Sequence, residues 1–343
     1  MHSHACGKEQ FIDVCHRNWW YGSSLDTRLA RTSSHSTRSR TKSMYSALAN
    51  EILKLIAPSL WRLELVSKYL QICCVCLTVS GSHSTRNKSW GLIKSPGWGV
   101  SDLIHAQDVA LEHIHVRRWQ DGALLGTMPV NKTFGQQVVI HRADLHNALV
   151  EKALNLDNVH LRENCFVSSV NFKPASVTLA DGSIVRGDVV IGADGIKSTV
   201  RGHLLEDPHI DAIPTGDAAY RIMLPRSTME RDPELKKLVE EPQATRWLGP
   251  GRHIIAYPVR NHDLYNVVLL HPDRHEVEES WTTKGSKQEM IDHYAGWDPI
   301  VRKLIDLVVE DEVLEWKLCL HRPLKTWIRG PIALIGDACH PML

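Results

Sequence analysis

Apolar residues recur along this chain with two different periods, one typical of helices and one typical of strands. Between residues 46 and 70 the apolar positions follow helical spacing, with a break at Pro58, which predicts a packed helix. Its apolar stripe consists of Leu48, Ile52, Leu55 and Ile56. Residues 159–188 instead alternate between apolar and polar side chains, which predicts short β-strands.

Two-residue turn signals mark hairpins between such strands. Asp121-Gly122 lies between two short strand patterns, and Asp181-Gly182 lies between two others. Aspartate followed by glycine favours a tight hairpin turn, because glycine tolerates a positive φ angle. The sequence therefore predicts two separate β-hairpins.

Beyond residue 206 the apolar runs become longer and are separated by turns and short helices. Strands are predicted over residues 214–225, 245–258 and 264–270. Three helices begin at recognisable N-terminal signals, which are Asp232-Pro233, the capping box from Ser286 to Glu289, and Asp298-Pro299. This stretch predicts an antiparallel sheet accompanied by helices.

Two short apolar strands lead into similar turns that contain glycine and aspartate. The first strand, residues 189–191, leads into Asp194-Gly195 and a predicted helix start at Ser198. The second, residues 331–335, leads into Gly336-Asp337. A glycine lets a ligand approach the backbone, and the amides of a helix start attract a phosphate. In the first turn, Asp194 could accept a hydrogen bond from a ligand hydroxyl, and Arg201 could bind a phosphate. Considered alone, this turn is equally compatible with the simple end of a buried strand.

Taken together, the two turns resemble the DG and GD motifs of the FAD-dependent aromatic-ring hydroxylases, the salicylate-hydroxylase-like flavoprotein monooxygenases. The resemblance extends over about residues 84–343. It implies an α/β fold, in which an incomplete FAD/NAD(P)-binding Rossmann-like domain carries an inserted antiparallel-sheet substrate domain. The expected division is an atypical, partly disordered segment over 1–83, an FAD-binding domain over 84–205 and 322–343, and a substrate-binding domain over 206–321.

The resemblance also implies an activity and a set of cofactor contacts. The expected reaction is hydroxylation of a small phenol or aromatic acid, with FAD as cofactor, NADPH or NADH as electron donor and O2 as co-substrate, a chemistry compatible with secondary metabolism. The residues expected to contact the cofactor are Arg142, Asp194, Gly195, Arg201, Gly336 and Asp337. For Arg142, which stands where a strand enters a helix, an ion pair with a surface carboxylate is the alternative.

Three side chains are candidates for the substrate site. A phenolic substrate reacts fastest as a phenolate, so a cation or a base beside its oxygen would favour the reactive form. Arg221, on a predicted strand, is the first candidate for holding a substrate anion. Tyr257 and His253 lie four residues apart on another strand and share one of its faces. The alternatives are that Tyr257 packs under the sheet and that His253 is a surface residue.

The sequence departs from the family pattern at both ends. The expected Gly-x-Gly-x-x-Gly turn near the start does not occur, and Gly97-Trp98-Gly99 is the nearest approach to it. The chain stops at Leu343, where relatives continue into a helix with further glycines. A second hypothesis is therefore a truncated, catalytically impaired family member without stable FAD binding.

Composition and charge exclude several other classes of protein. The formal net charge of +1 across 343 residues argues against a nucleic-acid partner. The longest apolar run, residues 69–79, is about half of the ~20 residues that a membrane-spanning helix needs. Cys73, Cys74 and Cys76 fit no zinc-binding pattern, so no metal site is expected. A cytoplasmic location is expected, and the sequence gives no indication of the oligomeric state.

Overall fold

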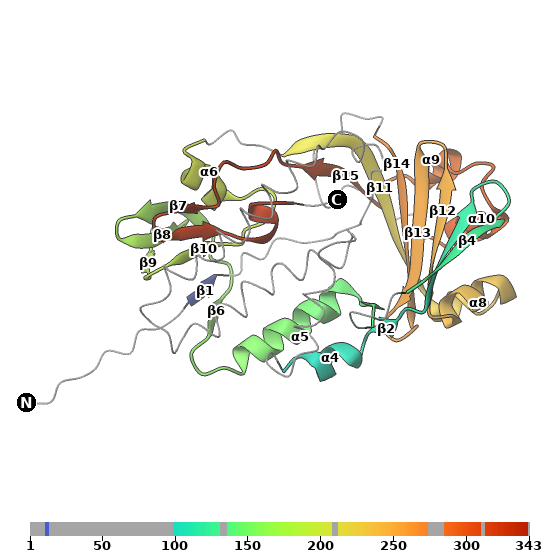
Figure 1. Cartoon of the computed structure of the whole chain (residues 1–343), viewed down its shortest axis with the longest axis horizontal. Coiled ribbons are helices and arrows are strands. Elements are labelled where there is room, and N and C mark those ends of the chain that lie inside the picture. Colours follow the sequence, from blue (N-terminus) through green and yellow to red (C-terminus); the bar gives the residue numbers. More distant parts are fainter. Residues whose placement is uncertain are drawn as a thin grey trace, which may run out of the picture.

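The computed structural model describes residues 11–13, 99–130, 136–207, 212–273, 285–309 and 313–341. The predicted helix over 46–70 and the three crowded cysteines lie outside the described residues. Figure 1 shows two units side by side, one built from short strands and one built around a large sheet. The helix α5 (Arg142–Leu154) runs along the first unit toward the base of the large sheet.

The first unit contains several small sheets. In one of them β10 and β17 run parallel and β16 is antiparallel to β17, and another is the meander β7-β8-β9. Two further pairs, β1 with β6 and β2 with β5, complete it. The strand bounds are Phe11–Asp13 (β1), Val109–Ala110 (β2), Val138–Val139 (β5), His160–Arg162 (β6), Val167–Phe172 (β7), Ala175–Leu179 (β8), Ile184–Arg186 (β9), Val190–Gly192 (β10), Ile328–Arg329 (β16) and Ile332–Leu334 (β17). The helices here are α4 (Ser101–His105) and α6 (Thr199–Leu205), besides α5.

The second unit is a sheet of seven strands in the order β15-β11-β14-β13-β12-β3-β4. Its bounds are His113–Arg118 (β3), Leu124–Pro129 (β4), Ile213–Pro225 (β11), Gln243–Gly249 (β12), Arg252–Val259 (β13), Leu264–Pro272 (β14) and Leu314–Leu320 (β15). Each predicted strand beyond residue 206 is therefore confirmed, and the stretch 245–258 is a hairpin of two strands.

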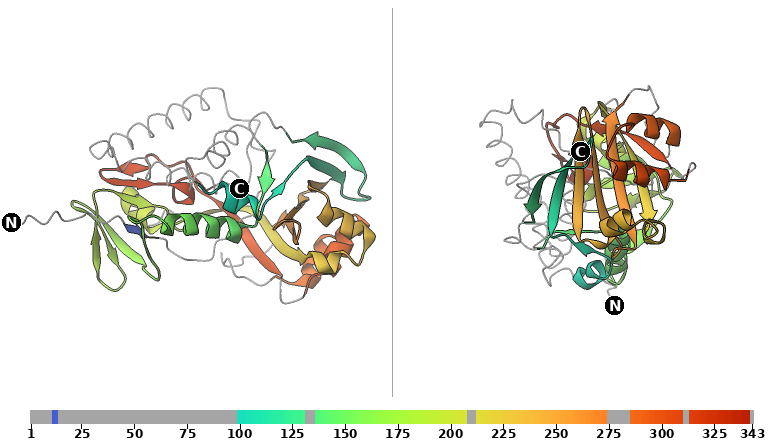
Figure 2. Two further views of the ribbon diagram at one scale, coloured as in Figure 1. Left: turned by 90° about the horizontal axis from the view of Figure 1, so that it is seen from below. Right: turned by 90° about the vertical axis from the view of Figure 1, so that its right-hand side faces the viewer.

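Helices cover one face of the large sheet, as Figure 2 shows from two further directions. They are α7 (Arg226–Met229), α8 (Pro233–Glu240), α9 (Lys287–His293) and α10 (Pro299–Asp306). Their apolar sides meet Tyr220, Trp247, Ile254 and Leu269, which are fully buried. The three predicted helix starts are confirmed, since the side chains of the capping residues accept backbone hydrogen bonds. These residues are Asp232, Ser286 and Asp298.

The large sheet differs from the expected antiparallel sheet in one respect. The strand β3 pairs in parallel with β12, so the hairpin β3–β4 joins the sheet although it lies far outside 206–321 in the sequence. The α/β fold class is confirmed. The division into domains stays a prediction, and the hairpin β3–β4 belongs to the large sheet although it lies within residues 84–205. In the described part of the chain, no helix combines the length and apolar character needed to cross a lipid bilayer.

Gly122, in the turn of the β3–β4 hairpin, is expected to tolerate no side chain. Its φ is +68°, and an added Cβ would lie 2.7 Å from the carboxyl carbon of Asp298. That carboxylate accepts a hydrogen bond from Trp247 and caps α10, so it has little freedom to move. The variant Gly122→Ala should lower the free energy of unfolding by about 3 kcal/mol, from left-handed strain and overpacking together.

A matched control separates these two contributions. Gly182 turns the β8–β9 hairpin with a φ of +83°, but an added Cβ there would meet nothing within 4 Å. Gly182→Ala should therefore cost only the backbone strain, about 1 kcal/mol. Urea denaturation of both variants measures the difference. Equal losses would show that Asp298 yields to the added methyl group.

Candidate functional site

The two glycine-containing turns lie next to each other at one edge of a sheet. Because β10 and β17 are parallel and Gly192 is opposite Leu334, both turns leave the same carboxyl end. The amide of Ile335 donates to the carbonyl of Gly192 at 2.9 Å. Gly195 and Gly336 have φ values of +80° and +60°, as expected of turns that need glycine. The structure thus joins two motifs that are far apart in the sequence.

Asp194 organises the start of the helix that follows it. Its carboxylate accepts hydrogen bonds from the Ser198 hydroxyl and, at 3.0 Å, from the Val200 amide. The Ser198 oxygen in turn accepts from the Arg201 amide at 2.9 Å, so the predicted helix start is confirmed. Both carboxylate oxygens of Asp194 take part within the turn. The predicted contact of Asp194 with a cofactor hydroxyl stays a prediction. That contact would use the lone pairs of the carboxylate oxygens that these hydrogen bonds leave free.

Arg201 links the two turns from inside the protein. Its side chain is 2% exposed, and its guanidinium donates to the carbonyl of Ile196 at 2.6 Å and to that of Ala338 at 3.1 Å. These two carbonyls belong to the first and the second turn respectively. The predicted contact of Arg201 with a phosphate stays a prediction, and the guanidinium fixes one turn relative to the other.

The remaining predicted cofactor residues lie at the starts of helices. Asp337 is buried in the short 3-10 helix η4 (Gly336–Ala338) that follows β17. Arg142 is the first residue of α5 and is half-buried. Two residues further on, Asp144 receives a bidentate ion pair from Arg260, at the end of β13, with distances of 2.7 and 2.9 Å. This ion pair holds the start of α5 against the large sheet.

The three substrate-site candidates share one face of the large sheet. Arg221 is opposite Val268, and Val268 is opposite Ile255, so these three side chains point the same way. Tyr257 and His253 lie two positions to either side of Ile255 and therefore point that way as well. The helices α8, α9 and α10 cover the opposite face. The face that carries Arg221 instead packs against β2 and β5, the strands that lead toward α5.

Arg221 sits in a largely buried cluster of polar and aromatic groups. Its Nε donates to the side-chain oxygen of Asn266 at 3.2 Å, and its guanidinium lies 5.6 Å from the ring centre of Trp316. A hydrogen bond joins it to Tyr257. Burial lowers the pKa of Arg221, Tyr257 opposes that shift, and the positive charge of Arg142 adds to it. A substrate anion would relieve both the burial and the repulsion of this cation.

Tyr257 and His253 differ in their surroundings. Burial raises the pKa of Tyr257, which keeps the phenol protonated and able to donate, while Arg221 acts in the opposite direction. Burial, aided by the charge of Arg246, lowers the pKa of His253 to about 4, so its ring is neutral near neutral pH. The structure joins Arg221 to Tyr257 and places Arg142 near enough for its charge to act on Arg221, but it shows no contact between His253 and Tyr257.

The low pKa of His253 gives an expected dependence of stability on pH. In the unfolded chain this histidine takes up a proton near pH 6.5, whereas in the folded protein it stays neutral down to about pH 4. The unfolded state therefore binds more protons between these values, and stability falls as the pH falls through that window. Between about pH 7.5 and pH 5 the loss attributable to His253 should approach 2 kcal/mol.

Urea denaturation of the wild type and of His253→Gln at both pH values measures this contribution. The variant should lose less stability on acidification than the wild type, because it no longer carries the depressed group. Parallel losses in the two proteins would show that the ring of His253 is solvated and titrates normally.

Sequence reasoning missed several residues of this site. Asn266 orients Arg221, Trp316 covers it, and the pair of Asp144 and Arg260 joins α5 to the sheet. The partners Asp144 and Arg260 are 116 residues apart, so no local pattern could reveal them. For Asn266 a signal existed, since an amide within an otherwise apolar strand has to find a hydrogen-bond partner when buried.

Comparison with known proteins identifies the relatives of this chain. No protein-family model matches it. It is 41% identical over 245 residues to the FAD-dependent monooxygenase atnJ of Arthrinium sp, a match covering 71% of this chain and 58% of that protein. These curated relatives are named FAD-dependent monooxygenases. The 6-hydroxynicotinate 3-monooxygenase of Pseudomonas fluorescens is 32% identical over 254 residues, which cover 71% of this chain and 62% of that enzyme.

Solved structures agree with this chain in fold. A salicylate hydroxylase in complex with its substrate superposes with a TM-score of 0.59 at 23% identity, covering 78% of this chain and 71% of that one. This likeness concerns the fold alone. The chain spans less than two thirds of the length of the curated monooxygenases that it matches.

Proposed function

We propose that the chain binds FAD and, with NADH or NADPH and O2, hydroxylates a small aromatic substrate that carries a carboxylate or a phenol. The observation that carries this proposal is the pair of Arg221 and Tyr257, which a hydrogen bond joins and on which the charge of Arg142 acts. The first two lie on the helix-free face of the large sheet, and Arg142 lies close enough to affect the pKa of Arg221. An anion site on one unit thus lies beside a predicted cofactor contact on the other.

The residues at the paired turns fit a dinucleotide cofactor. Gly195 and Gly336 turn the chain with positive φ angles at one edge of the sheet, and Arg142 supplies a cation at the start of α5. Such a cofactor, when bound, supplies the redox and oxygen chemistry that side chains lack. The protein then needs to hold the cofactor, orient the aromatic ring and exclude water.

The substrate residues have distinct roles in this proposal. Arg221 binds the anionic group of the substrate, and Asn266 keeps the guanidinium in place through its side-chain oxygen. Tyr257 stays protonated because of its burial and donates a hydrogen bond to the bound oxygen. The charge of Arg221 favours ionisation of a phenol held against it, which makes the ring more electron-rich.

Two measurements on the purified chain test the proposal. The protein should retain added FAD after gel filtration, seen as the visible absorption of bound flavin. It should then consume O2 with NADH or NADPH only when an aromatic acid such as salicylate or 6-hydroxynicotinate is present, and form a hydroxylated product. Failure to retain FAD would favour a catalytically impaired family member. Substrate oxidation without O2 uptake would indicate a dehydrogenase instead.

A further inference from the structure

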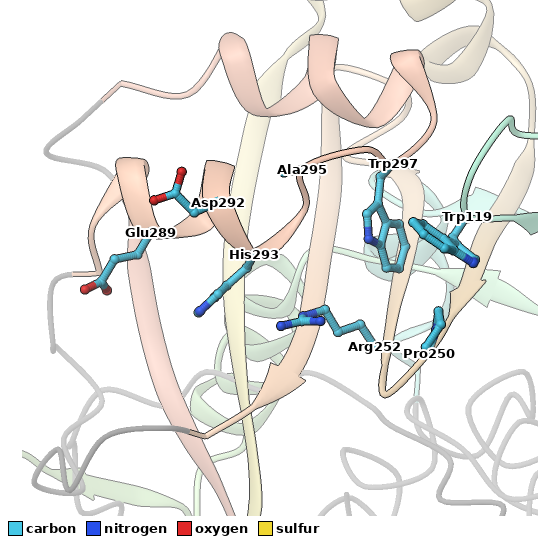
Figure 3. A pocket seen from close by; sticks show the side chains of 8 residues that line it. All are labelled: Trp119, Pro250, Arg252, Glu289, Asp292, His293, Ala295 and Trp297. Carbon is cyan, nitrogen blue, oxygen red and sulfur yellow. The ribbon is translucent and has the colours of Figure 1, made fainter.

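A cleft lies at the far end of the large sheet, on the face covered by helices. Its volume is about 530 Å³, and it lies between the β12–β13 turn, α9 and the aromatic residues that flank them. Figure 3 shows the side chains around it, with Trp119 and Trp297 on one side and His293 on the other. The lining residues are Trp119, Pro250, Arg252, Glu289, Asp292, His293, Ala295 and Trp297.

Arg252 is the central cation of this cleft. It is the first residue of β13 and points to the face shared with Ile254, whereas its neighbour His253 points to the face of Arg221. The cleft and the proposed substrate site are therefore on opposite faces of one sheet. The Nε atom of Arg252 is buried and has no hydrogen-bond partner among the residues that the structure describes. Buried donors in proteins are usually hydrogen-bonded, so a ligand acceptor placed beside this Nε atom would satisfy it.

Two tryptophans form an aromatic wall beside this cation. The rings of Trp119 and Trp297 lie 5.7 Å apart between centres and are inclined by 53°. The turn residue Gly249 permits this arrangement, because an added Cβ would lie 2.8 Å from the ring of Trp297 and 3.0 Å from Trp119. In Figure 3 the guanidinium of Arg252 extends from the tryptophan side toward His293. A ligand with a flat ring and an anionic group could therefore place the ring against the tryptophans and the anion at Arg252.

The other charged residues of the cleft limit the positions at which a ligand can carry a negative charge. Asp292 already accepts a hydrogen bond from Gln288 at 2.9 Å, and Glu289 is exposed to solvent. Figure 3 shows both carboxylates directed away from the space between Arg252 and His293. His293 is held by Tyr220, whose hydroxyl lies 3.2 Å from its Nδ1. A ligand with a single negative charge, placed at Arg252, fits this distribution.

We infer that the cleft is a second ligand site, which binds a planar aromatic carboxylate. The carboxylate accepts hydrogen bonds from Arg252, and the ring lies against Trp119 and Trp297. Because the cleft is on the far face of the sheet, occupancy does not require the residues of the proposed substrate site. A molecule bound here would contact α9 and β13 at once and so connect to the strand that carries Tyr257.

Calorimetric titration of the full chain with 2-naphthoate tests this inference. All measurements use the Arg221→Met background, in which the proposed substrate site has lost its cation. That protein should bind one equivalent of 2-naphthoate, and the added change Arg252→Gln should weaken binding about tenfold or more, as expected for loss of a charge-assisted hydrogen bond. Added Arg252→Lys should retain part of the affinity. Added Trp119→Leu should weaken binding as well, while cyclohexanecarboxylate should bind poorly to every variant.

Several outcomes would overturn the inference. One is undetectable binding of 2-naphthoate in the Arg221→Met background. Another is equal affinity with and without Arg252. Thermal unfolding of each variant checks that the fold is retained, and the half-buried position of Arg252, at the rim of the cleft, makes retention the expected result. Because none of these measurements depends on FAD or on turnover, their failure is distinguishable from failure of the proposed monooxygenase activity.

Discussion

Replacing Arg201 with methionine is expected to lower the free energy of unfolding by roughly 3–5 kcal/mol, because two buried carbonyl groups lose their donor. Ile196 and Ala338 receive the guanidinium at 2.6 and 3.1 Å, and the side chain is 2% exposed, so water cannot replace it. Methionine fills much of the same volume but donates no hydrogen bond. The loss is measured by urea denaturation.

Two controls define what this result means. Arg201→Lys keeps the charge but lacks the planar fork that reaches both carbonyls, so it should recover only part of the stability. Arg302→Met removes an exposed ion pair with Asp306 on α10 and should change stability by less than about 0.5 kcal/mol. The Arg201→Met protein should also retain FAD poorly, since the two turns are no longer fixed to each other. A loss as small as that of Arg302→Met would contradict the linking role.

The substitution Arg221→Met is expected to lower kcat/KM for an aromatic acid about 100-fold, which corresponds to loss of a charge-assisted contact in a buried site. The cation is held by Asn266 and Tyr257 and is half-buried, so water replaces the bound anion only in part. For a neutral substrate analogue without the carboxylate, the decrease in kcat/KM should be much smaller. Arg221→Lys should restore part of the activity toward the acid. Steady-state O2 consumption measures all of these rates.

The matched control for this experiment is Arg246→Met. Arg246 is opposite Ile255 on the same face of the sheet, three strands away from Arg221. Its removal takes the same charge from the same face, and kcat/KM should change by less than about threefold. FAD retention is measured for each variant, so that weak cofactor binding is not mistaken for weak substrate binding. Equal losses in the two variants would indicate a general electrostatic effect instead of a specific anion site.

Much of the local structure could be read from the sequence. Ser198, Asp232, Ser286 and Asp298 cap helices as their spacing predicts, and Gly122 turns a hairpin at a positive φ. These interactions join residues within a few positions of one another, so the chemistry of a short segment determines them. The shared face of Tyr257 and His253 follows in the same way from the alternation of side chains along one strand.

Other features depend on contacts that no short segment contains. The sequence suggested that Arg201 meets a phosphate, which stays a prediction, but no local pattern showed that its guanidinium reaches a carbonyl 137 residues away. The sequence placed residues 113–129 with the first unit, but parallel pairing of β3 with β12 adds them to the large sheet. Hydrogen bonds between strands form equally well with many partners, so the order of strands follows from the packing of the whole.

The sequence by itself determined the likeness to FAD-dependent monooxygenases, the two acidic turns and which side chains share a strand face, since motifs and periodicity are local properties. Only the tertiary structure decided what those faces meet. It put Arg221 beside Asn266 and near Arg142, tied α5 to the sheet through Asp144 and Arg260, and turned Arg252 toward an aromatic cleft. The reason is physical: alternation fixes the direction of a side chain, whereas its neighbours across space depend on how distant segments bury their apolar surface together.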